Sequence, residues 1–365
     1  MLPVKLHHLQ RLTDDTGLLE HCFGKVPRRK EGYSTDDNAR ALWACMEWLR
    51  YARAAGEDAE ISVLMDLADR YLAFLMWVQD EAGWFHNNVR FDRSFEPEER
   101  SDDCQGRSLW ALAVTAVMHP DESRAEPARA MCRQGFRVAE ELRFPRGLAH
   151  TLAAACALLL GTETMVDHHA FRTWVQEELR PLALRITEQL CQSYETHRQP
   201  EWRWFEARMT YGNGVLPWSL YWAHQTLGHT RALAIAEDAL AFLVERMTSE
   251  KGCLRPIGNR SWATPEQTSA WDQQPLEMMK LALACAKAWE VTRNDEYCSL
   301  LERCVRWFEG DNDLGVPVAD VKDGGCCDGL REDGLNQNQG AESTLSYLLT
   351  QAIYHNARHG GGRYE

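Results

Sequence analysis

The stretch Tyr33-Ser-Thr-Asp-Asp-Asn-Ala-Arg40 runs without a break into an apolar helical pattern. Leu42, Met46 and Leu49 follow at spacings of four and three residues, which is the period of an amphipathic α-helix. Ser, Thr, Asp and Asn are the residue types that cap helix N-termini. The stretch therefore predicts a long helix whose first turn is polar and acidic.

Five more helix starts along the chain have the same organisation. They are Ser101-Asp-Asp-Cys-Gln-Gly-Arg107, Pro145-Arg-Gly-Leu-Ala-His150, Tyr211-Gly-Asn-Gly-Val-Leu-Pro217, Trp271-Asp-Gln-Gln-Pro275 and Asn336-Gln-Asn-Gln-Gly-Ala-Glu342. Further helical patterns lie between them, at 61–78, 124–142, 169–194, 231–247 and 296–308. Strand patterns are weak, and a small ribbon is expected only at 84–91.

This alternation has a geometric consequence. Helices that are joined head to tail place every second N-terminus at the same end of the molecule. If six such hairpins close into a ring, the six polar starts converge on one mouth. We therefore expect an all-α fold, with one domain that spans residues 1–365.

Bulk properties exclude several classes of protein. The chain has 365 residues, of which 45% are apolar and 26% charged, and its net charge is −14. Such an acidic chain is unsuited to nucleic acid or to an anionic membrane surface. No segment approaches the ~18 continuous apolar residues of a membrane span. Residues 1–11 lack the apolar core of a signal peptide, so we expect a cytoplasmic protein.

Cysteine and histidine patterns predict no metal site and no cofactor. The 12 cysteines are scattered and include no CxxC pair, which is typical of reduced core thiols. No cluster has zinc-ligand spacing, and no calcium-loop pattern occurs.

Several stretches resemble a family of bacterial proteins in the six-hairpin glycosidase superfamily, whose members occur alone or attached to glycosyltransferase domains. The resemblance implies an (α/α)6 toroid of six helical hairpins, a sugar or oligosaccharide substrate, and a functional association with a glycosyltransferase. It carries no assignment of catalytic residues. The matching stretches are 32–42, 101–111, 202–206, 272–275, 312–315, 324–329 and 338–344.

Carboxylates at the expected mouth suggest glycoside cleavage, which needs one acid to protonate the leaving oxygen and a second carboxylate to activate water or attack carbon. Glu206 follows Trp204 and Phe205, and apolar neighbours raise a carboxyl pKa, so we predict Glu206 as the general acid. Asp37 or Asp103 is predicted as the base, because a helix N-terminus keeps a carboxylate ionised. Asp272 is a further catalytic candidate. The alternatives are an arginine partner for Glu206, either Arg203 or Arg208, and simple capping for each aspartate.

The remaining mouth residues are candidates for sugar binding. Arg40 and Arg107 follow their aspartate pairs by three or four residues, so each shares a helix face with those carboxylates or binds an acidic sugar. Amide side chains match sugar hydroxyls, and tryptophans in loops can stack on a pyranose. The predicted substrate-binding residues are Asp36, Arg40, Asp102, Gln105, Arg107, His150, Trp204, Asn213, Trp271, Gln273, Asn338 and Glu342.

These residues favour a glycoside hydrolase that acts on a short oligosaccharide. A sugar epimerase or isomerase is one alternative, with His150 as its base. A second is a non-catalytic carbohydrate-binding partner of a glycosyltransferase. A polysaccharide lyase ranks below both, because it needs basic residues for uronate carboxylates and the mouth offers few beyond Arg40, Arg107 and Arg146.

Overall fold

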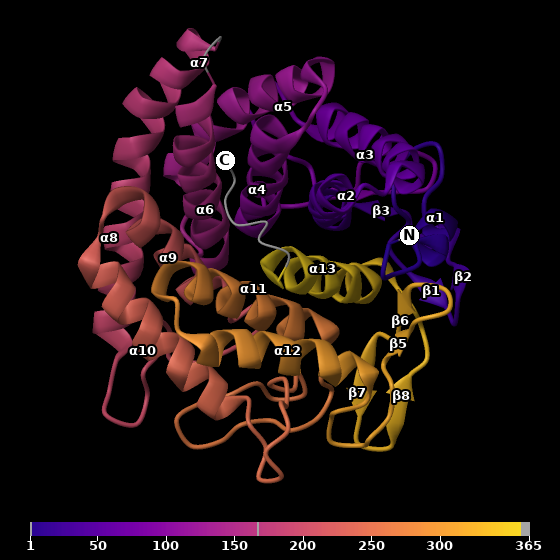
Figure 1. The fold of residues 1–365 in the computed structure, drawn as a ribbon, viewed down its shortest axis with the longest axis vertical. Coiled ribbons are helices and arrows are strands. Elements are labelled where there is room, and N and C mark those ends of the chain that lie inside the picture. The colour runs from indigo at the N-terminus through magenta and orange to yellow at the C-terminus, as the bar shows by residue number, and fades with distance from the viewer. Residues whose placement is uncertain (1, 166–167, 359–365) are drawn as a thin grey trace.

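Six inner helices form a closed ring in the computed structural model, which describes residues 2–165 and 168–358. Each inner helix packs against the next, and the last packs against the first (Figure 1). The fold is an (α/α)6 toroid, and all six predicted inner helix starts are confirmed. The inner helices are α2 (Thr35–Ala55), α4 (Asp102–Met118), α6 (Pro145–Gly161), α9 (Val215–Leu227), α11 (Pro275–Thr292) and α13 (Ala341–Arg358).

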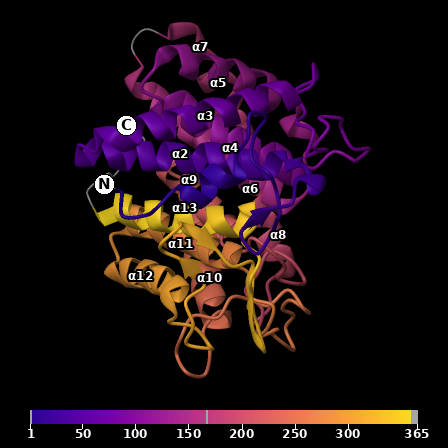
Figure 2. The same ribbon diagram turned by 90° about the vertical axis from the view of Figure 1, so that its right-hand side faces the viewer.

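The outer helices pack one each against the inner helices (Figures 1 and 2). The short α1 contacts α13 and takes the sixth outer position, so the two ends of the chain together complete one hairpin. The outer helices are α1 (His7–Leu12), α3 (Asp58–Val78), α5 (Glu122–Gly135), α8 (Arg180–His197), α10 (Thr230–Arg246) and α12 (Asp295–Glu309), with α7 (His169–Trp174) and the π-turn η4 (Val175–Leu179) leading into α8. No helix in the described part of the chain is long and apolar enough to cross a bilayer.

Short antiparallel strand pairs tie the loops together. The expected ribbon at 84–91 is only partly correct, because β4 (Asn88–Val89) pairs with β3 (Tyr33–Ser34) immediately before α2. This pair joins the loop before α4 to the start of α2. The other pairs are β1 (Cys22–Phe23) with β2 (Val26–Pro27), β5 (Ala319–Asp320) with β6 (Gly325–Cys326), and β7 (Gly329–Arg331) with β8 (Gly334–Asn336).

Tryptophans from the inner helices pack against one another inside the ring. Trp110 on α4 packs edge-to-face against Trp218 on α9, with ring centroids 4.7 Å apart. Trp43 on α2 and Trp222 on α9 each contact Trp110 at 5.7 Å. Edge-to-face packing of this kind adds to the free energy of burying the rings. The interior of the toroid is therefore a packed core and not a channel.

Glycines let inner helices approach closely beside the mouth. A Cβ atom on Gly106 of α4 would lie 2.5 Å from the Gly147 carbonyl oxygen of α6. A Cβ atom on Gly147 would lie 2.5 Å from the carbonyl oxygen of Asp102. Both positions therefore require glycine for a steric reason, and this contact brings the first turns of α4 and α6 together.

We predict that Gly147→Ala lowers the free energy of unfolding by about 2–3 kcal/mol, because the new methyl group overlaps backbone atoms that cannot move aside. Gly228→Ala is the matched control. Gly228 has a φ of +70° and no atom within 4 Å of an added Cβ, so backbone strain alone applies there and costs about 1 kcal/mol. Urea denaturation measures both values. An equal or smaller loss for Gly147→Ala would contradict the close contact.

Candidate active site

A cavity of about 620 Å³ opens at the mouth of the toroid, between the first turns of α2 and α13 and the loops before α11 and α13. We call it the mouth cavity. Its lining is strongly acidic. Among the described residues it includes six carboxyl side chains and two guanidinium groups: Glu20, Asp36, Asp37, Asp272, Asp328 and Glu342, with Arg40 and Arg331.

Asp37 is a buried carboxyl group in the first turn of α2, only 3% exposed. Its carboxylate accepts from Ser34 Oγ at 3.0 Å and from Arg40 Nη1 at 2.6 Å. Burial raises the pKa of Asp37 to about 7, with the nearby Glu342 carboxylate adding to the rise and Arg40 opposing it. The prediction that the helix N-terminus keeps Asp37 ionised as a base is therefore wrong, because burial and neighbouring carboxylates outweigh the helix dipole.

Asp36, the preceding residue, has the opposite electrostatic environment. Arg107 Nη1 of α4 lies 2.5 Å from Asp36 Oδ2. Burial alone would raise the pKa of Asp36, but the Arg107 and Arg40 guanidinium groups outweigh burial and hold the pKa below its ordinary value. Within the described residues, Asp36 Oδ1 has no hydrogen-bond partner.

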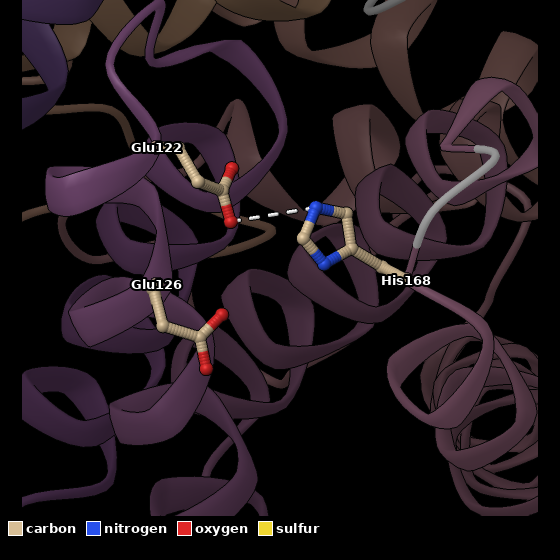
Figure 3. Close-up of side chains that lie close together, drawn as sticks. All are labelled: Glu122, Glu126 and His168. Carbon is tan, nitrogen blue, oxygen red and sulfur yellow. Dashed lines mark ion pairs between the residues drawn. The ribbon is translucent and has the colours of Figure 1, made fainter.

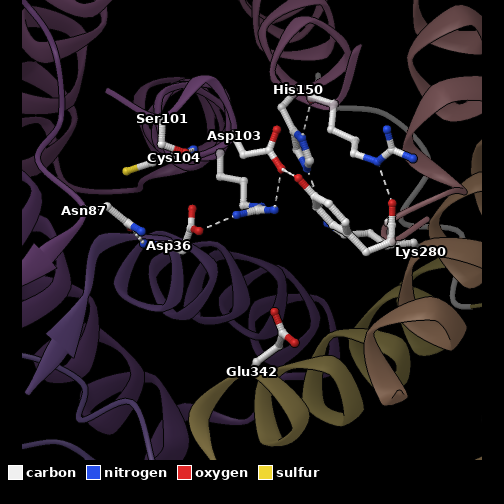
Figure 4. A network of polar contacts seen from close by, with 12 residues as sticks. Asp36, Asn87, Ser101, Asp103, Cys104, His150, Lys280 and Glu342 are labelled. Carbon is white, nitrogen blue, oxygen red and sulfur yellow. Dashed lines mark hydrogen bonds and ion pairs between the residues drawn. The ribbon is translucent and has the colours of Figure 1, made fainter. Parts of the chain in front are cut away.

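Arg107 also holds Asp103, one turn earlier in α4, at 3.1 Å. Asp103 is labelled in Figure 4, and the Tyr211 hydroxyl donates to the same Asp103 oxygen at 2.6 Å. Asp103 thus has two donors that fix its carboxylate. It lies outside the residues that line the mouth cavity. Its predicted role as a base is therefore not favoured by its position.

Arg40 bridges two helices in the same way. Its Nη2 lies 2.9 Å from Glu342 Oε2 of α13, while its Nη1 donates to Asp37. Arg40 therefore pairs with Asp37 of its own helix and with Glu342 of α13. Arg107 pairs in the same way with Asp103 of its own helix and with Asp36 of α2. Of the two predicted roles for these arginines, the structure favours carboxylate pairing over binding of an acidic sugar.

Glu206 pairs with Arg146 of α6. Arg146 Nη1 donates to both Glu206 oxygens, at 2.9 and 2.7 Å, and Arg146 Nε donates to the Tyr211 carbonyl. The Glu206 carboxylate therefore contacts a guanidinium group, whereas the sequence predicted apolar surroundings for it. Glu206 also lies outside the lining of the mouth cavity. The premise for its role as the general acid is therefore wrong, and the arginine partner is neither of the two that the sequence suggested.

Trp204 was expected to stack on a sugar, but it is fully buried and packs edge-to-face against Phe205. No face is left for a ligand, so this prediction is wrong. Trp271 is only partly buried and remains a candidate. Its neighbour Asp272 lines the mouth cavity and pairs with Arg260 at 3.2 Å.

Several predicted binding residues instead hold loops in place. Asp102 Oδ2 accepts from the backbone N–H groups of Arg143 and Phe144, just before α6. Gln105 is fully buried and bonds three backbone groups, while Asn338 Oδ1 accepts from the Gly24 N–H. These three side chains therefore have structural partners, and it is Ser101, not Asp102, that caps α4.

Gln273 both supports a loop and lines the cavity. Its Nε2 donates to the Ala270 carbonyl at 2.9 Å and to Asp313 Oδ2 at 2.8 Å. Its side chain is fully buried, and its Oε1 has no hydrogen-bond partner in the described part of the chain. The sequence-based prediction of Gln273 as a binding residue is thus compatible with its position.

Two buried basic groups meet below the mouth, as Figure 4 also shows. His150 Nδ1 donates to the Arg146 carbonyl at 2.9 Å, so its Nε2 is left to accept from Lys280 Nζ at 3.3 Å. Burial lowers the pKa of His150 well below its usual range, and the positive charges of Lys280 and Arg107 add to this effect. Burial likewise lowers the pKa of Lys280, with Arg107 and Arg40 adding to the fall.

Two buried charged residues of α11, Lys280 and Glu277, were not predicted from the sequence. Glu277 is buried and accepts from Asn213 Nδ2 at 2.9 Å and from the Gly212 N–H. Asn213, a predicted binding residue, is thus held by Glu277 and by the Thr210 carbonyl. Charged residues at positions 277 and 280, within the otherwise apolar helical pattern, were the signal that could have identified them.

A group of two carboxylates and one histidine lies on the outer face (Figure 3). Glu122 and Glu126 are exposed on α5, and His168 Nε2 lies 3.4 Å from a Glu122 oxygen. Arg129 Nε donates to Glu126 at 2.9 Å, and Arg129 Nη2 donates to Glu122. A guanidinium group therefore already supplies the positive charge there. The expectation that the protein needs no metal or cofactor stays a prediction.

Comparison with known proteins shows similarity at the level of the fold. No protein-family model and no curated protein sequence matches the chain. Cellobiose 2-epimerase from Bacillus thermoamylovorans superposes with a TM-score of 0.72 and 13% identity, over 97% of this chain and 96% of that one. A D-mannose isomerase gives a TM-score of 0.69 and 10% identity, over 96% and 94% of the two chains.

A third similar structure is an α-1,6-mannanase of a Salegentibacter species in complex with α-1,6-mannotetrose. It is an inactive variant in which two consecutive aspartates are replaced by alanine. The TM-score is 0.62 and the identity 11%, over 96% of each chain. At such low identities these similarities establish the (α/α)6 toroid and leave the activity to be argued from the site.

Proposed function

We propose that the protein is a glycoside hydrolase that cleaves a short oligosaccharide in the mouth cavity, with Asp37 as the general acid. The observation that carries this proposal is the contrast between Asp36 and Asp37. They are consecutive carboxyl groups in one cavity, and their surroundings shift their pKa values in opposite directions. A difference of this kind between two carboxyl pKa values allows one group to act as the acid and the other as the base in glycoside hydrolysis.

Asp37 suits the acid role because its pKa of about 7 leaves a large fraction protonated near neutral pH. Asp36 suits the role of the ionised partner, since Arg107 favours its charged form. Its Oδ1 is buried and has no partner among the described residues, so the protein itself leaves this acceptor unsatisfied. The mannanase on the same fold, inactive when two consecutive aspartates are replaced, supports an adjacent pair as the reacting groups.

An epimerase or isomerase is the second candidate, and one observation favours it. His150 and Lys280 are two bases whose lowered pKa values favour their neutral forms. Proton abstraction from a sugar needs such a base. Both side chains are buried, however, and His150 Nε2 already faces Lys280 Nζ. Proton–deuterium exchange into a free sugar in heavy water tests this candidate.

The other two alternatives rank lower. A lyase needs guanidinium groups that are available to uronate carboxylates, but Arg40, Arg107 and Arg146 are all paired with carboxylates of the protein itself. A non-catalytic partner of a glycosyltransferase would bind sugar without cleaving it, so the release of new reducing ends distinguishes a hydrolase from such a partner.

We predict that Asp37→Asn lowers kcat/KM by about 10²–10⁴-fold, because an amide cannot protonate the leaving oxygen. In the wild-type protein, kcat/KM should fall as the pH rises through about 7, since Asp37 then loses its proton. The assay measures new reducing ends from manno-, gluco- and galacto-oligosaccharides between pH 4 and 9.

Asp92→Asn is the matched control, because Asp92 is an exposed loop residue outside the mouth cavity. It should leave kcat/KM unchanged. Binding of these sugars without cleavage of any would contradict the hydrolase. An Asp37→Asn variant that keeps the wild-type rate would contradict the assignment of the acid.

We further predict that Glu342→Gln moves the alkaline limb of the pH profile to lower pH. The Glu342 carboxylate raises the pKa of Asp37 and shares Arg40 with it. Removing this negative charge leaves Arg40 to act on Asp37 alone, so the Asp37 pKa should fall. A limb that stays in place or moves to higher pH would show that Asp37 is not the titrating acid.

A further inference from the structure

The mouth cavity contains more negative charge than its own cations can neutralise. Arg40 is already shared between Asp37 and Glu342. Arg260, which reaches Asp272 from outside the lining, is also shared with Glu332 at 3.2 Å.

Glu20 and Asp328 have no such partner. In the parts of the chain that the structure describes, neither forms an ion pair with a lysine or arginine; His21 lies 3.4 Å from Glu20. Both residues contact the chain at Gly340 and Ala341, where α13 begins. Asp328 Oδ1 accepts from the Gly340 N–H at 2.8 Å, and the Glu20 carbonyl accepts from the Ala341 N–H at 2.9 Å.

The pKa shifts of Glu20 and Asp328 also support a cation in this part of the cavity. Burial raises the pKa of Glu20, and the carboxylates of Asp36 and Glu342 add to the rise. Burial also raises the pKa of Asp328, and Glu342 adds to it. A cation placed among these groups would relieve their mutual repulsion.

Unsatisfied hydrogen-bonding atoms in the lining give independent support. Two acceptors, Asp36 Oδ1 and Gln273 Oε1, have no partner among the described residues, and Gln273 is fully buried. One donor, Arg40 Nε, is also unsatisfied, and a sugar ring or hydroxyl oxygen would suit it. An ammonium group supplies three donors and no acceptor, so it suits a cavity whose lining is rich in acceptors and negative charge.

We infer that the sugar bound in the mouth cavity carries a free, protonated amine, as a hexosamine or a hexosamine oligosaccharide does. The inference rests on the proposed function only in taking this cavity as the sugar site. An N-acetylated or neutral sugar would leave the carboxylates without a counter-charge, so the same cavity would discriminate against it.

The test compares binding of three matched ligands to the wild-type chain by calorimetric titration at pH 6 and low salt. The ligands are glucosamine, N-acetylglucosamine and glucose, each also tested as its β-1,4-linked dimer. We expect the free-amine sugars to bind at least about tenfold more tightly than both counterparts. The advantage should shrink as salt is added, because the attraction is electrostatic.

Two variants act on the charge of the cavity in opposite directions. Glu20→Gln should weaken binding of the free-amine sugars about three- to tenfold, and should weaken binding of the neutral sugars less. Arg331→Gln removes a positive charge from an exposed side chain of the lining and should strengthen amine binding. Asp92→Asn is the control, since Asp92 is an exposed loop residue outside the lining. Thermal unfolding verifies that each variant is folded.

Neutral or acetylated sugars that bind as tightly as the free amines, or free amines that do not bind, would overturn the inference. Its failure is distinguishable from that of the proposed function. Selective amine binding without cleavage of any sugar contradicts the hydrolase and supports the inference. Cleavage of neutral sugars without preference for the amine supports the hydrolase and contradicts the inference.

Discussion

Contact between α13 and α2 closes the ring, and the candidate site depends on this closure. These helices come from opposite ends of the chain, yet Arg40 Nη2 lies 2.9 Å from Glu342 at one end of the contact. At the other end, Asn356 Nδ2 donates to the Glu47 carbonyl at 3.0 Å. With the ring closed, the inner helices all begin at the same end. Polar first turns that are far apart in sequence therefore become neighbours around one cavity.

The arginines at the mouth shift the pKa values of the carboxyl groups that they contact. Arg107 stabilises the charge of Asp36, whereas the single guanidinium group of Arg40 serves both Asp37 and Glu342. Buried carboxylates need such partners, because an unpaired buried charge is very costly. Burial, the Glu342 carboxylate and the unequal supply of arginine together shift the pKa values of two consecutive aspartates in opposite directions.

The sequence predicted those features that depend on local pattern. Residues 35–55 have the period of a helix and a capping serine within one short window, α4 has both as well, and the other four inner helices have the period. The acidic mouth followed from their common polar starts. By contrast, the pKa of Asp37 depends on Glu342, and the partner of Glu206 is Arg146 on another hairpin. Both interactions join residues that are far apart in the sequence, so no local pattern predicts them.

Burial was equally hard to predict from the sequence. Trp204 lies in a loop segment and was expected to be exposed, but packing against Phe205 buries it completely. Lys280 is one of two charged residues in an otherwise apolar helical pattern, but nothing local to that pattern places its side chain beside His150. Both outcomes are set by how the hairpins pack around the ring, which local periodicity does not report.

A crystal structure of the Asp37→Asn variant with an intact oligosaccharide would show whether these distant helix starts build a single catalytic site. The account predicts a sugar in the mouth cavity, with its glycosidic oxygen within hydrogen-bonding distance of the residue 37 side chain and its anomeric carbon facing Asp36. A sugar bound elsewhere on the toroid, or one whose glycosidic bond lies out of reach of both residues, would contradict it.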